Sequence, residues 1–325
     1  MKLSAFEYLE PKSLAEACSI LAEYGDRVRV TAGGTDILPR MKQGLFEPQY
    51  LMSIKRIEEI SAIQETEEGL RIGSAVTLAN IHKSVAVQGR APILSEAAMA
   101  VGATQLQNMG TVGGNVCLET RCWYYQQDAS WRQSRSACIK LGGEICHMAK
   151  GSKRCYALYS GDTAAALLAI GGKARLVSLR GERILPLEDF YIDDGKSNTV
   201  RLPDELLAEV MIPAQPDGQA GTYLKFRKRG AIDFPIVGVG AVLTTKRGLC
   251  QQVRVAVTGV GSAPFAVKGV EDLLIEKELT SDLIEQVAAL AFSQAKPVSH
   301  MEVSAVYRKQ LVRVLVKDAL CKLTS

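Results

Sequence analysis

Residues 111–162 read TVGGNVCLETRCWYYQQDASWRQSRSACIKLGGEICHMAKGSKRCYALYSGD. The stretch opens with a glycine turn at Thr111 to Asn115 and ends at Asp162, where an alanine- and leucine-rich helix is predicted to begin. The residues between them lack helix or strand periodicity, and so long a loop in a compact domain is either functional or disordered. Its tryptophans, tyrosines and cysteines argue against disorder, because disordered segments are poor in such residues. We therefore expect a functional loop that is held in place.

Five of the eight cysteines in the chain lie in this stretch, and we interpret cysteine–metal bonds as its anchor. They are Cys117, Cys122, Cys138, Cys146 and Cys155. The N-terminus lacks the apolar run of a signal peptide, and no apolar segment of about 18 residues occurs, so we expect a cytoplasmic protein. In that reducing compartment, clustered cysteines are more often metal ligands than disulfides.

The length of 325 residues exceeds what one hydrophobic core usually serves and predicts two or three domains. Hydrophobic residues make up 47% and charged residues 23%, as in ordinary globular proteins. The net charge of +4 is modest, and no basic helix lies outside the cysteine-rich stretch. Nucleic-acid binding is therefore not expected.

The first half of the chain contains a strand, a glycine turn and a helix in succession. A helix is predicted from Ser13 to Tyr24, with Cys18 on its apolar face and Gly25 as its C-cap. A strand at 27–31 leads into Ala-Gly-Gly-Thr-Asp at 32–36 and a second helix at 37–43. This arrangement points backbone N–H groups at an anion, although many such corners need glycine for steric reasons alone.

The glycine turn at 111–115 is the second of its kind, and each turn carries threonine with a neighbouring Asn or Asp. Short strands at 49–54 and 70–76 and helices at 77–84 and 93–100 are predicted between the turns. Paired turns can hold a diphosphate from two sides. Neither turn has the spacing of the Rossmann fingerprint or the P-loop, so those nucleotide folds are disfavoured.

A second domain is expected beyond a boundary near residue 215, where Asp217-Gly218-Gln219 resembles a linker. Before it, a helix at 163–170 and strands at 173–179 and 183–187 are predicted. Beyond it, the expected elements are strands at 223–228, 236–244 and 253–260 and helices at 266–276, 281–294 and 304–322. They indicate a sheet with helices on one face. The isolated residues Cys250, Cys321, His82 and His300 are interpreted as non-ligands.

Taken together, the motifs resemble the medium, FAD-binding subunits of the molybdenum hydroxylase family. The matching segments are Ala32–Asp36 with Met41-Lys42, Thr111–Asn115, Asp162, Tyr223–Arg227 and Tyr307-Arg308. The resemblance implies an α+β fold: a two-lobed FAD-binding domain of the vanillyl-alcohol-oxidase type at 1–215 and a smaller C-terminal α/β domain at 216–325. The two lobes would span about 1–57 and 58–215.

The resemblance also implies non-covalent FAD bound by both turns. The residues expected at the flavin are Thr31, Ala32, Gly33, Gly34, Thr35, Asp36, Ile37, Gly102, Thr104, Thr111, Gly114, Asn115, Cys117, Asp162 and Lys225. Glycine permits close backbone approach, and Thr35, Thr111 and Asn115 would add side-chain hydrogen bonds. The first turn holds no histidine, so a covalent histidyl linkage is not expected there.

Residues 119–159 depart from the usual family pattern, in which the second turn soon reaches the aspartate helix. One branch of the family carries a [4Fe–4S] cluster on such an insertion, which implies that the cluster ligands here are Cys122, Cys138, Cys146 and Cys155. From the residues alone, four thiolates suit a cubane cluster or tetrahedral zinc. Their wide spacing matches neither paired zinc ligands nor ferredoxin signatures. His147 is an alternative ligand.

No constellation for substrate chemistry is visible, so we expect an electron-transfer subunit whose substrate binds in a partner. The resemblance implies a large subunit with a molybdenum cofactor and a small subunit with two [2Fe–2S] centres. Electrons would pass from ferredoxin through [4Fe–4S] and FAD to these centres and remove a phenolic hydroxyl from an aromatic thioester. Two alternatives remain open: a hydroxylase subunit passing electrons outward to NAD or quinone, and a flavoprotein with a structural zinc loop.

Overall fold

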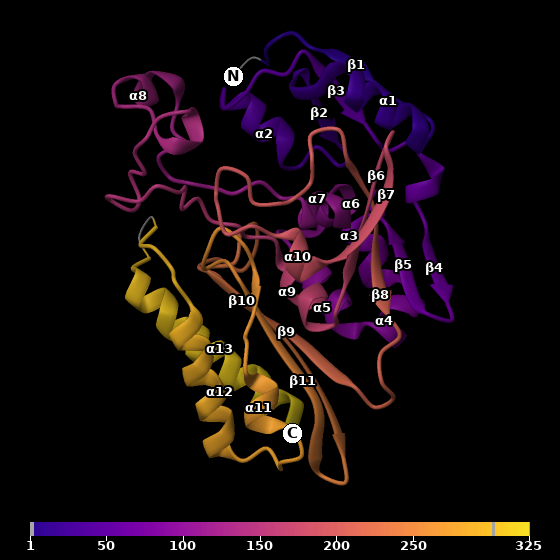
Figure 1. The fold of residues 1–325 in the computed structure, drawn as a ribbon, viewed down its shortest axis with the longest axis vertical. Helices are drawn as coiled ribbons and strands as arrows, with labels where there is room; N and C mark the ends of the chain where they lie inside the picture. The colour runs from indigo at the N-terminus through magenta and orange to yellow at the C-terminus, as the bar shows by residue number, and fades with distance from the viewer. Residues whose placement is uncertain (1–2, 301–302, 325) are drawn as a thin grey trace.

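Three β-sheets organise residues 3–300 and 303–324, the ranges that this computed structural model describes. A three-stranded sheet lies at one end of the molecule, a five-stranded sheet in the middle and a four-stranded sheet toward the other end (Figure 1). Helices pack between and around these sheets. The expected mixed helix-and-sheet architecture is confirmed.

The three-stranded sheet is parallel and has the order β1–β3–β2. Its elements are β1 (Glu7–Leu9), α1 (Leu14–Tyr24), η1 (Gly25–Arg27), β2 (Val28–Thr31), α2 (Ile37–Lys42) and β3 (Tyr50–Ser53). Helix α1 begins where the Ser13 side chain accepts a hydrogen bond from the Glu16 N–H. It ends at Gly25, whose φ is 52°, as a C-cap glycine allows. Cys18 is buried on its inner face, which confirms it as a core residue.

The five-stranded sheet is antiparallel and has the order β4–β5–β8–β6–β7. Its strands are β4 (Ile63–Thr66), β5 (Gly69–Gly73), β6 (Lys173–Ser178), β7 (Gly181–Pro186) and β8 (Leu206–Pro213), and η2 (Glu58–Ile60) precedes β4. The accompanying helices are α3 (Leu78–Lys83), α4 (Val85–Arg90), α5 (Pro92–Ala100), α6 (Thr104–Met109), α7 (Val112–Val116), α9 (Asp162–Ala169) and α10 (Leu187–Phe190). Every residue of α9 is buried. The second glycine turn, expected as a turn, forms the helix α7.

The four-stranded sheet is antiparallel and has the order β12–β11–β10–β9. Its elements are β9 (Ala220–Phe226), β10 (Val237–Lys246), β11 (Leu249–Thr258), β12 (Phe265–Ala266), α11 (Val270–Leu274), α12 (Ser281–Gln294) and α13 (Ala305–Thr324). The three helices lie beside the sheet (Figure 1), as predicted, while α5 and α9 also pack against its strands. The helix expected at 266–276 is shorter, because residues 265–266 pair as a strand. None of the helices in the described ranges is long and apolar enough to cross a membrane.

The cysteine-rich segment, residues 119–159, is irregular apart from α8 (Ala129–Gln133) and η3 (Ile139–Leu141). Helix α8 projects from the body of the molecule (Figure 1). The ends of the segment meet, because Arg121 and Leu158 exchange two backbone hydrogen bonds of 2.8 and 2.7 Å. Near the first end, the Trp123 N–H donates to His300 Nε2 at 3.1 Å. Backbone and side-chain contacts therefore order the segment.

A buried ion pair joins α9 to the C-terminal sheet. Asp162 begins α9, and its carboxylate lies 3.0 Å from Lys225 Nζ on β9, with the side chains 2% and 5% exposed. The Tyr223 hydroxyl donates to the same carboxylate at 2.7 Å, and Lys225 also donates to the Ala100 carbonyl at 2.8 Å. The pair therefore links three elements.

We predict that replacing Lys225 with Met destabilises the protein by about 3–5 kcal/mol, because it leaves the Asp162 carboxylate buried and unpaired. Urea unfolding followed by circular dichroism measures this change. The double variant Asp162→Asn, Lys225→Met should lose less than the two single variants together. In the control Arg313→Met, the partner Glu285 is partly exposed, and we expect a loss of about 1 kcal/mol or less. A Lys225→Met protein as stable as the wild type would contradict the prediction.

Candidate functional site

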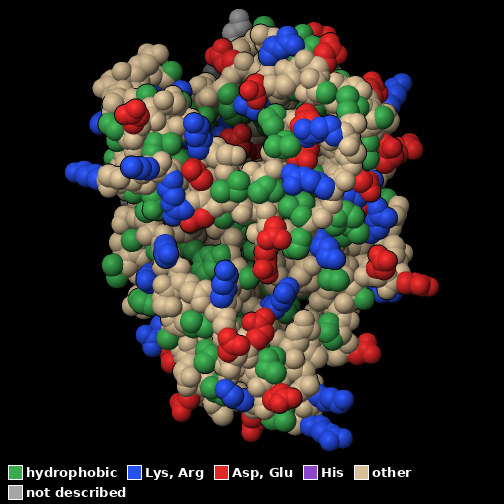
Figure 2. All heavy atoms as spheres, viewed as in Figure 1, with side chains coloured by type: hydrophobic (Ala, Val, Ile, Leu, Met, Phe, Trp, Pro, Cys, Tyr) green, Lys and Arg blue, Asp and Glu red, His purple; other side chains and the backbone are tan. Residues whose placement is uncertain are grey.

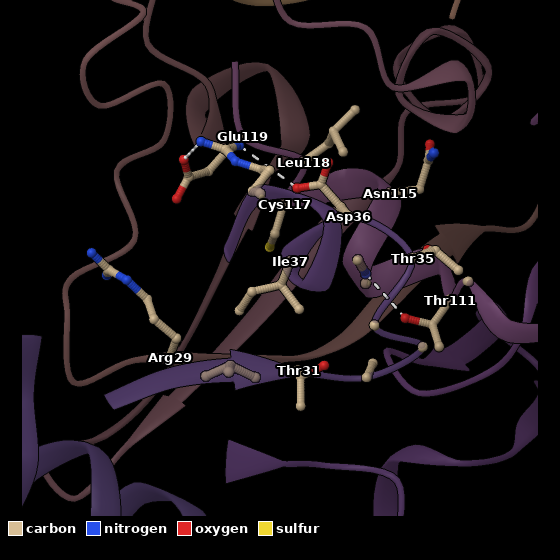
Figure 3. Close-up of a pocket in the computed structure, with 18 of the residues that line it drawn as sticks. Arg29, Thr31, Thr35, Asp36, Ile37, Thr111, Asn115, Cys117, Leu118 and Glu119 are labelled. Carbon is tan, nitrogen blue, oxygen red and sulfur yellow. Dashed lines mark hydrogen bonds and ion pairs between the residues drawn. The ribbon is translucent and has the colours of Figure 1, made fainter. Parts of the chain in front are cut away.

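A cavity of about 1080 Å³ opens between the three-stranded sheet and the rest of the molecule. In the space-filling view, the surface is hollowed below the region that contains the three-stranded sheet (Figure 2). Its walls come from β2 and the first glycine turn, α7 and the second turn, and the loops at 196–203 and 232–234. Figure 3 shows Arg29 and Thr31 on β2 across from Cys117 and Glu119. The volume is at the upper end of the range for small-molecule and cofactor sites.

The first glycine turn lies directly against the end of α6. A Cβ atom on Gly33 would stand 1.8 Å from the Met109 carbonyl oxygen, so only glycine fits there. Gly34 has a φ of +71°, which also favours glycine. The backbone N–H groups of Gly34, Thr35 and Asp36 donate to no acceptor within the described residues. These donors, on a turn that lines the cavity, fit an anionic ligand.

The second turn is built around Thr111, whose hydroxyl accepts a hydrogen bond from the Gly114 N–H at 3.1 Å (Figure 3). Gly113 lies so close to Ser74 that a Cβ would approach the Ser74 Cβ to 2.5 Å. A Cβ on Gly114, in contrast, would meet only the Thr111 hydroxyl within 4 Å. Because Gly114 lines the cavity, a larger residue there would fill space that a ligand needs.

The side-chain oxygen of Asn115 is engaged within the protein. It accepts hydrogen bonds from the N–H and the hydroxyl of Thr163, at 3.0 and 2.7 Å. The residue lines the cavity, but this oxygen is directed at the start of α9. Asn115 therefore joins the second turn to the buried helix.

A network of charged side chains lines the cavity beside the first turn. Arg40, only 1% exposed, pairs with Glu119 and lies 3.6 Å from Asp36. Arg121 pairs with the same Asp36 carboxylate. Burial alone would raise the pKa of Glu119, but Arg40 and Lys140 together hold it below the usual value. The Nε atoms of Arg40 and Arg121 have no hydrogen-bond partner in the described ranges, which also suits an anionic ligand.

Most residues that the sequence indicates for the flavin lie together on this cavity. Those that line it are Thr31, Ala32, Gly33, Gly34, Thr35, Asp36, Ile37, Gly102, Thr111, Gly114, Asn115, Cys117 and Asp162. Thr104 and Lys225 are not among the lining residues. Lys225 forms an ion pair with Asp162, which does line the cavity. The lining residues that we did not predict include Arg29, Arg40, Glu119, Arg121, Lys140, Arg201 and Phe234. A run of polar residues from Asp193 to Asn198 is a local sequence signal for the wall at 196–203.

Cys122, Cys138, Cys146 and Cys155 all line a second, much smaller pocket of about 10 Å³. Cys138 is half-buried and the other three are buried. Burial raises the pKa of Cys155 to about 11. His147 also lines this pocket, where its ring stacks on Tyr124 at 4.9 Å. Within the described ranges, no group of three or more His, Cys, Asp or Glu side chains is arranged so that it could hold a metal ion.

Cys117 lies apart from these four cysteines and lines the large cavity. Two residues, Tyr125 and Lys140, line both the cavity and the cysteine pocket. The cysteine-rich segment thus contributes to two adjoining sites.

Comparison with known proteins covers nearly the whole chain. Residues 4–215 match the family model of the FAD-binding domain in molybdopterin dehydrogenase, and residues 222–323 match that of the CO dehydrogenase flavoprotein C-terminal domain. The chain is 28% identical to 6-hydroxypseudooxynicotine dehydrogenase complex subunit alpha of Paenarthrobacter nicotinovorans, over 99% of this chain and 95% of that protein. It is 26% identical to the carbon monoxide dehydrogenase medium chain of Hydrogenophaga pseudoflava, over 97% of this chain and 96% of that protein.

The fold agrees with these matches. A solved structure of carbon monoxide dehydrogenase from H. pseudoflava, lacking the Mo-pyranopterin moiety, superposes with a TM-score of 0.82 at 26% identity. The match covers 99% of this chain and 98% of that one. A crystal structure of a Cu,Mo-CO dehydrogenase gives a TM-score of 0.84 at 25% identity, over 99% of both chains. The chain belongs to the FAD-binding medium subunits of the molybdenum hydroxylase family.

Proposed function

We propose that this chain is the electron-transfer subunit of a 4-hydroxybenzoyl-CoA reductase and carries both FAD and a [4Fe–4S] cluster. The observation that carries the proposal is the convergence of Cys122, Cys138, Cys146 and Cys155 on one pocket beside the flavin cavity. The sequence resembles the beta subunit of that enzyme, in which an inserted loop carries such a cluster. Substrate chemistry would take place in a partner subunit.

FAD in the large cavity would meet the two glycine turns. The N–H groups of Gly34 and Thr35 would hold the diphosphate, and Gly114 would allow the backbone to approach it. Arg40 and Arg121 lie along the same wall, where each is paired with a carboxylate and each has an Nε atom without a hydrogen-bond partner in the described ranges. FAD supplies exchange of one or two electrons, so it can couple single-electron centres to a two-electron reaction. The protein binds it, orients it and sets its electrostatic surroundings.

The cysteine pocket offers the donor set of a cubane cluster, which is four thiolates. The free volume there is only about 10 Å³, so the thiol side chains would rotate outward around a cluster. Ligation would deprotonate the thiols, and the bond energy would add to the contacts that order the segment. A cluster at this place would adjoin the flavin cavity, where electron transfer is useful. A zinc ion would provide structural support only.

The charge of the cysteine-rich segment supports an acidic protein as electron donor. Its seven Lys and Arg residues outnumber its three Asp and Glu residues, so it accounts for the entire net charge of +4. Lys and Arg side chains are prominent on the flank near α8 (Figure 2). Ferredoxin is a donor of this kind, because complementary charge speeds encounter between such proteins. In the proposed complex, electrons pass on to a small subunit with [2Fe–2S] centres and a large molybdenum subunit.

A second candidate function is outward electron transfer from a hydroxylase to NAD or quinone. The names of the relatives of this chain favour this second candidate, since they include a nicotine 6-hydroxylase medium subunit and a nicotinate dehydrogenase FAD-subunit. The proposed reductase is distinguished by the cysteine pocket.

The FAD site predicts that replacing Gly114 with Val prevents flavin binding, because the side chain enters the cavity. Flavin absorbance after gel filtration measures occupancy, and acid precipitation of the wild type should release the FAD. The control is Gly89→Val, since a Cβ on Gly89 meets no atom within 4 Å. Full FAD occupancy in the Gly114→Val protein would refute this assignment.

The cysteine pocket predicts about four irons per chain in protein prepared without oxygen. Changing Cys122, Cys138, Cys146 or Cys155 to Ser should lower the iron content, while FAD remains bound. The matched control is Cys250→Ser, which alters a buried cysteine of the C-terminal sheet and should keep its iron. Zinc without iron in the wild-type protein would contradict the cluster assignment. Loss of iron in Cys250→Ser, with iron kept in the four pocket variants, would contradict it as well.

The reductase assignment predicts that the complete complex converts 4-hydroxybenzoyl-CoA to benzoyl-CoA when a low-potential reductant supplies electrons. The isolated chain should accept those electrons without acting on the thioester, because no substrate constellation is expected in it. Product analysis by chromatography tests both statements. A complex that only oxidises substrates and reduces NAD or quinone would support the second candidate, and turnover by the isolated chain would refute the subunit role.

A further inference from the structure

The large cavity and the cysteine pocket share two lining residues, Tyr125 and Lys140. The Tyr125 side chain is buried, and Lys140 Nζ lies 5.4 Å from the centre of its ring. Lys140 therefore lies beside both spaces, and its charge can act on a group bound in either one.

The Lys140 ammonium is held in place by neutral acceptors. It donates hydrogen bonds to the Thr120 hydroxyl at 2.6 Å and to the Gly195 carbonyl at 2.7 Å. Thr120 precedes Cys122 by two residues, and the Gly195 N–H donates to the Cys155 carbonyl at 2.9 Å. The cation is thus fixed to the backbone next to two of the four cysteines.

The charge of Lys140 acts in both directions. Burial lowers the pKa of Lys140, whereas Glu119 on the cavity side and the Cys155 and Cys122 thiols on the other side act to raise it. The Glu119 carboxylate is itself paired with Arg40. Reducing a flavin or an iron–sulfur cluster adds negative charge, which a nearby cation stabilises.

We propose that Lys140 sets the reduction potentials of both redox groups, raising each by its positive charge. The inference rests on the proposed function, because it requires FAD in the cavity and a cluster among the cysteines. Each transfer would oxidise a bound cluster by one electron and reduce a bound flavin by one electron, and the external donor would reduce the cluster again before the next transfer. Because one cation lies beside both groups, it shifts both reduction potentials in the same direction.

The test is Lys140→Met, with both potentials measured in the complete complex. Potentiometric titration followed by electron paramagnetic resonance reports the cluster, and visible absorbance reports the flavin. We expect both reduction potentials to fall. For the cluster, we expect the equilibrium constant for reduction to fall about tenfold, which corresponds to about 59 mV for one electron. Lys140→Arg keeps the charge and should restore most of the shift. The matched control is Lys150→Met, an exposed lysine of the same segment that lines neither space.

Equal potentials in Lys140→Met and Lys150→Met would overturn the inference. If Lys140→Met loses its iron, its flavin potential is compared with that of iron-free Cys122→Ser, which retains the lysine. A lower flavin potential in Lys140→Met supports the inference, and equal values overturn it. Failure of the proposed function looks different, because the wild-type protein would then contain no iron.

Discussion

The site depends on one close backbone contact. Gly33 lies against the Met109 carbonyl, where a single added Cβ would stand 1.8 Å from the oxygen. This contact brings the turn after β2 to the start of α7, although the two segments are far apart in the chain. Both turns then line the same cavity with little side-chain bulk, and the first turn adds backbone N–H groups that donate to no acceptor in the described ranges. Any residue larger than glycine would push the turns apart and widen the space between them.

Much of the fold could be predicted from the sequence because its signals are local. Helix α1 has its serine cap, its apolar face and its terminal glycine within a short span. Strand β8, at the centre of the five-stranded sheet, was missed. Nearly all of its residues are buried, so it lacks the alternation of polar and apolar residues that indicates a strand.

The sequence indicated the residues of the cavity wall that act through the backbone. It did not indicate the charged side chains that pair across distant segments. The glycine turns carry their geometry in their own residues, whereas the pairing of Arg40 with Glu119 joins two separate segments. No local pattern shows such a contact. Lys225 was predicted at the flavin from its motif; it is not among the residues that line the cavity, and it pairs with Asp162 on α9. Charged residues take their roles from partners that only the fold brings near.

The joined ends of the cysteine-rich segment have a consequence for the history of this protein. Arg121 and Leu158 exchange two backbone hydrogen bonds, so the host chain leaves and re-enters the domain at almost the same point. A loop that starts and ends at one place can lengthen or disappear without moving the elements around it. A segment of this kind can therefore be acquired in a single insertion event without disturbing the scaffold around it.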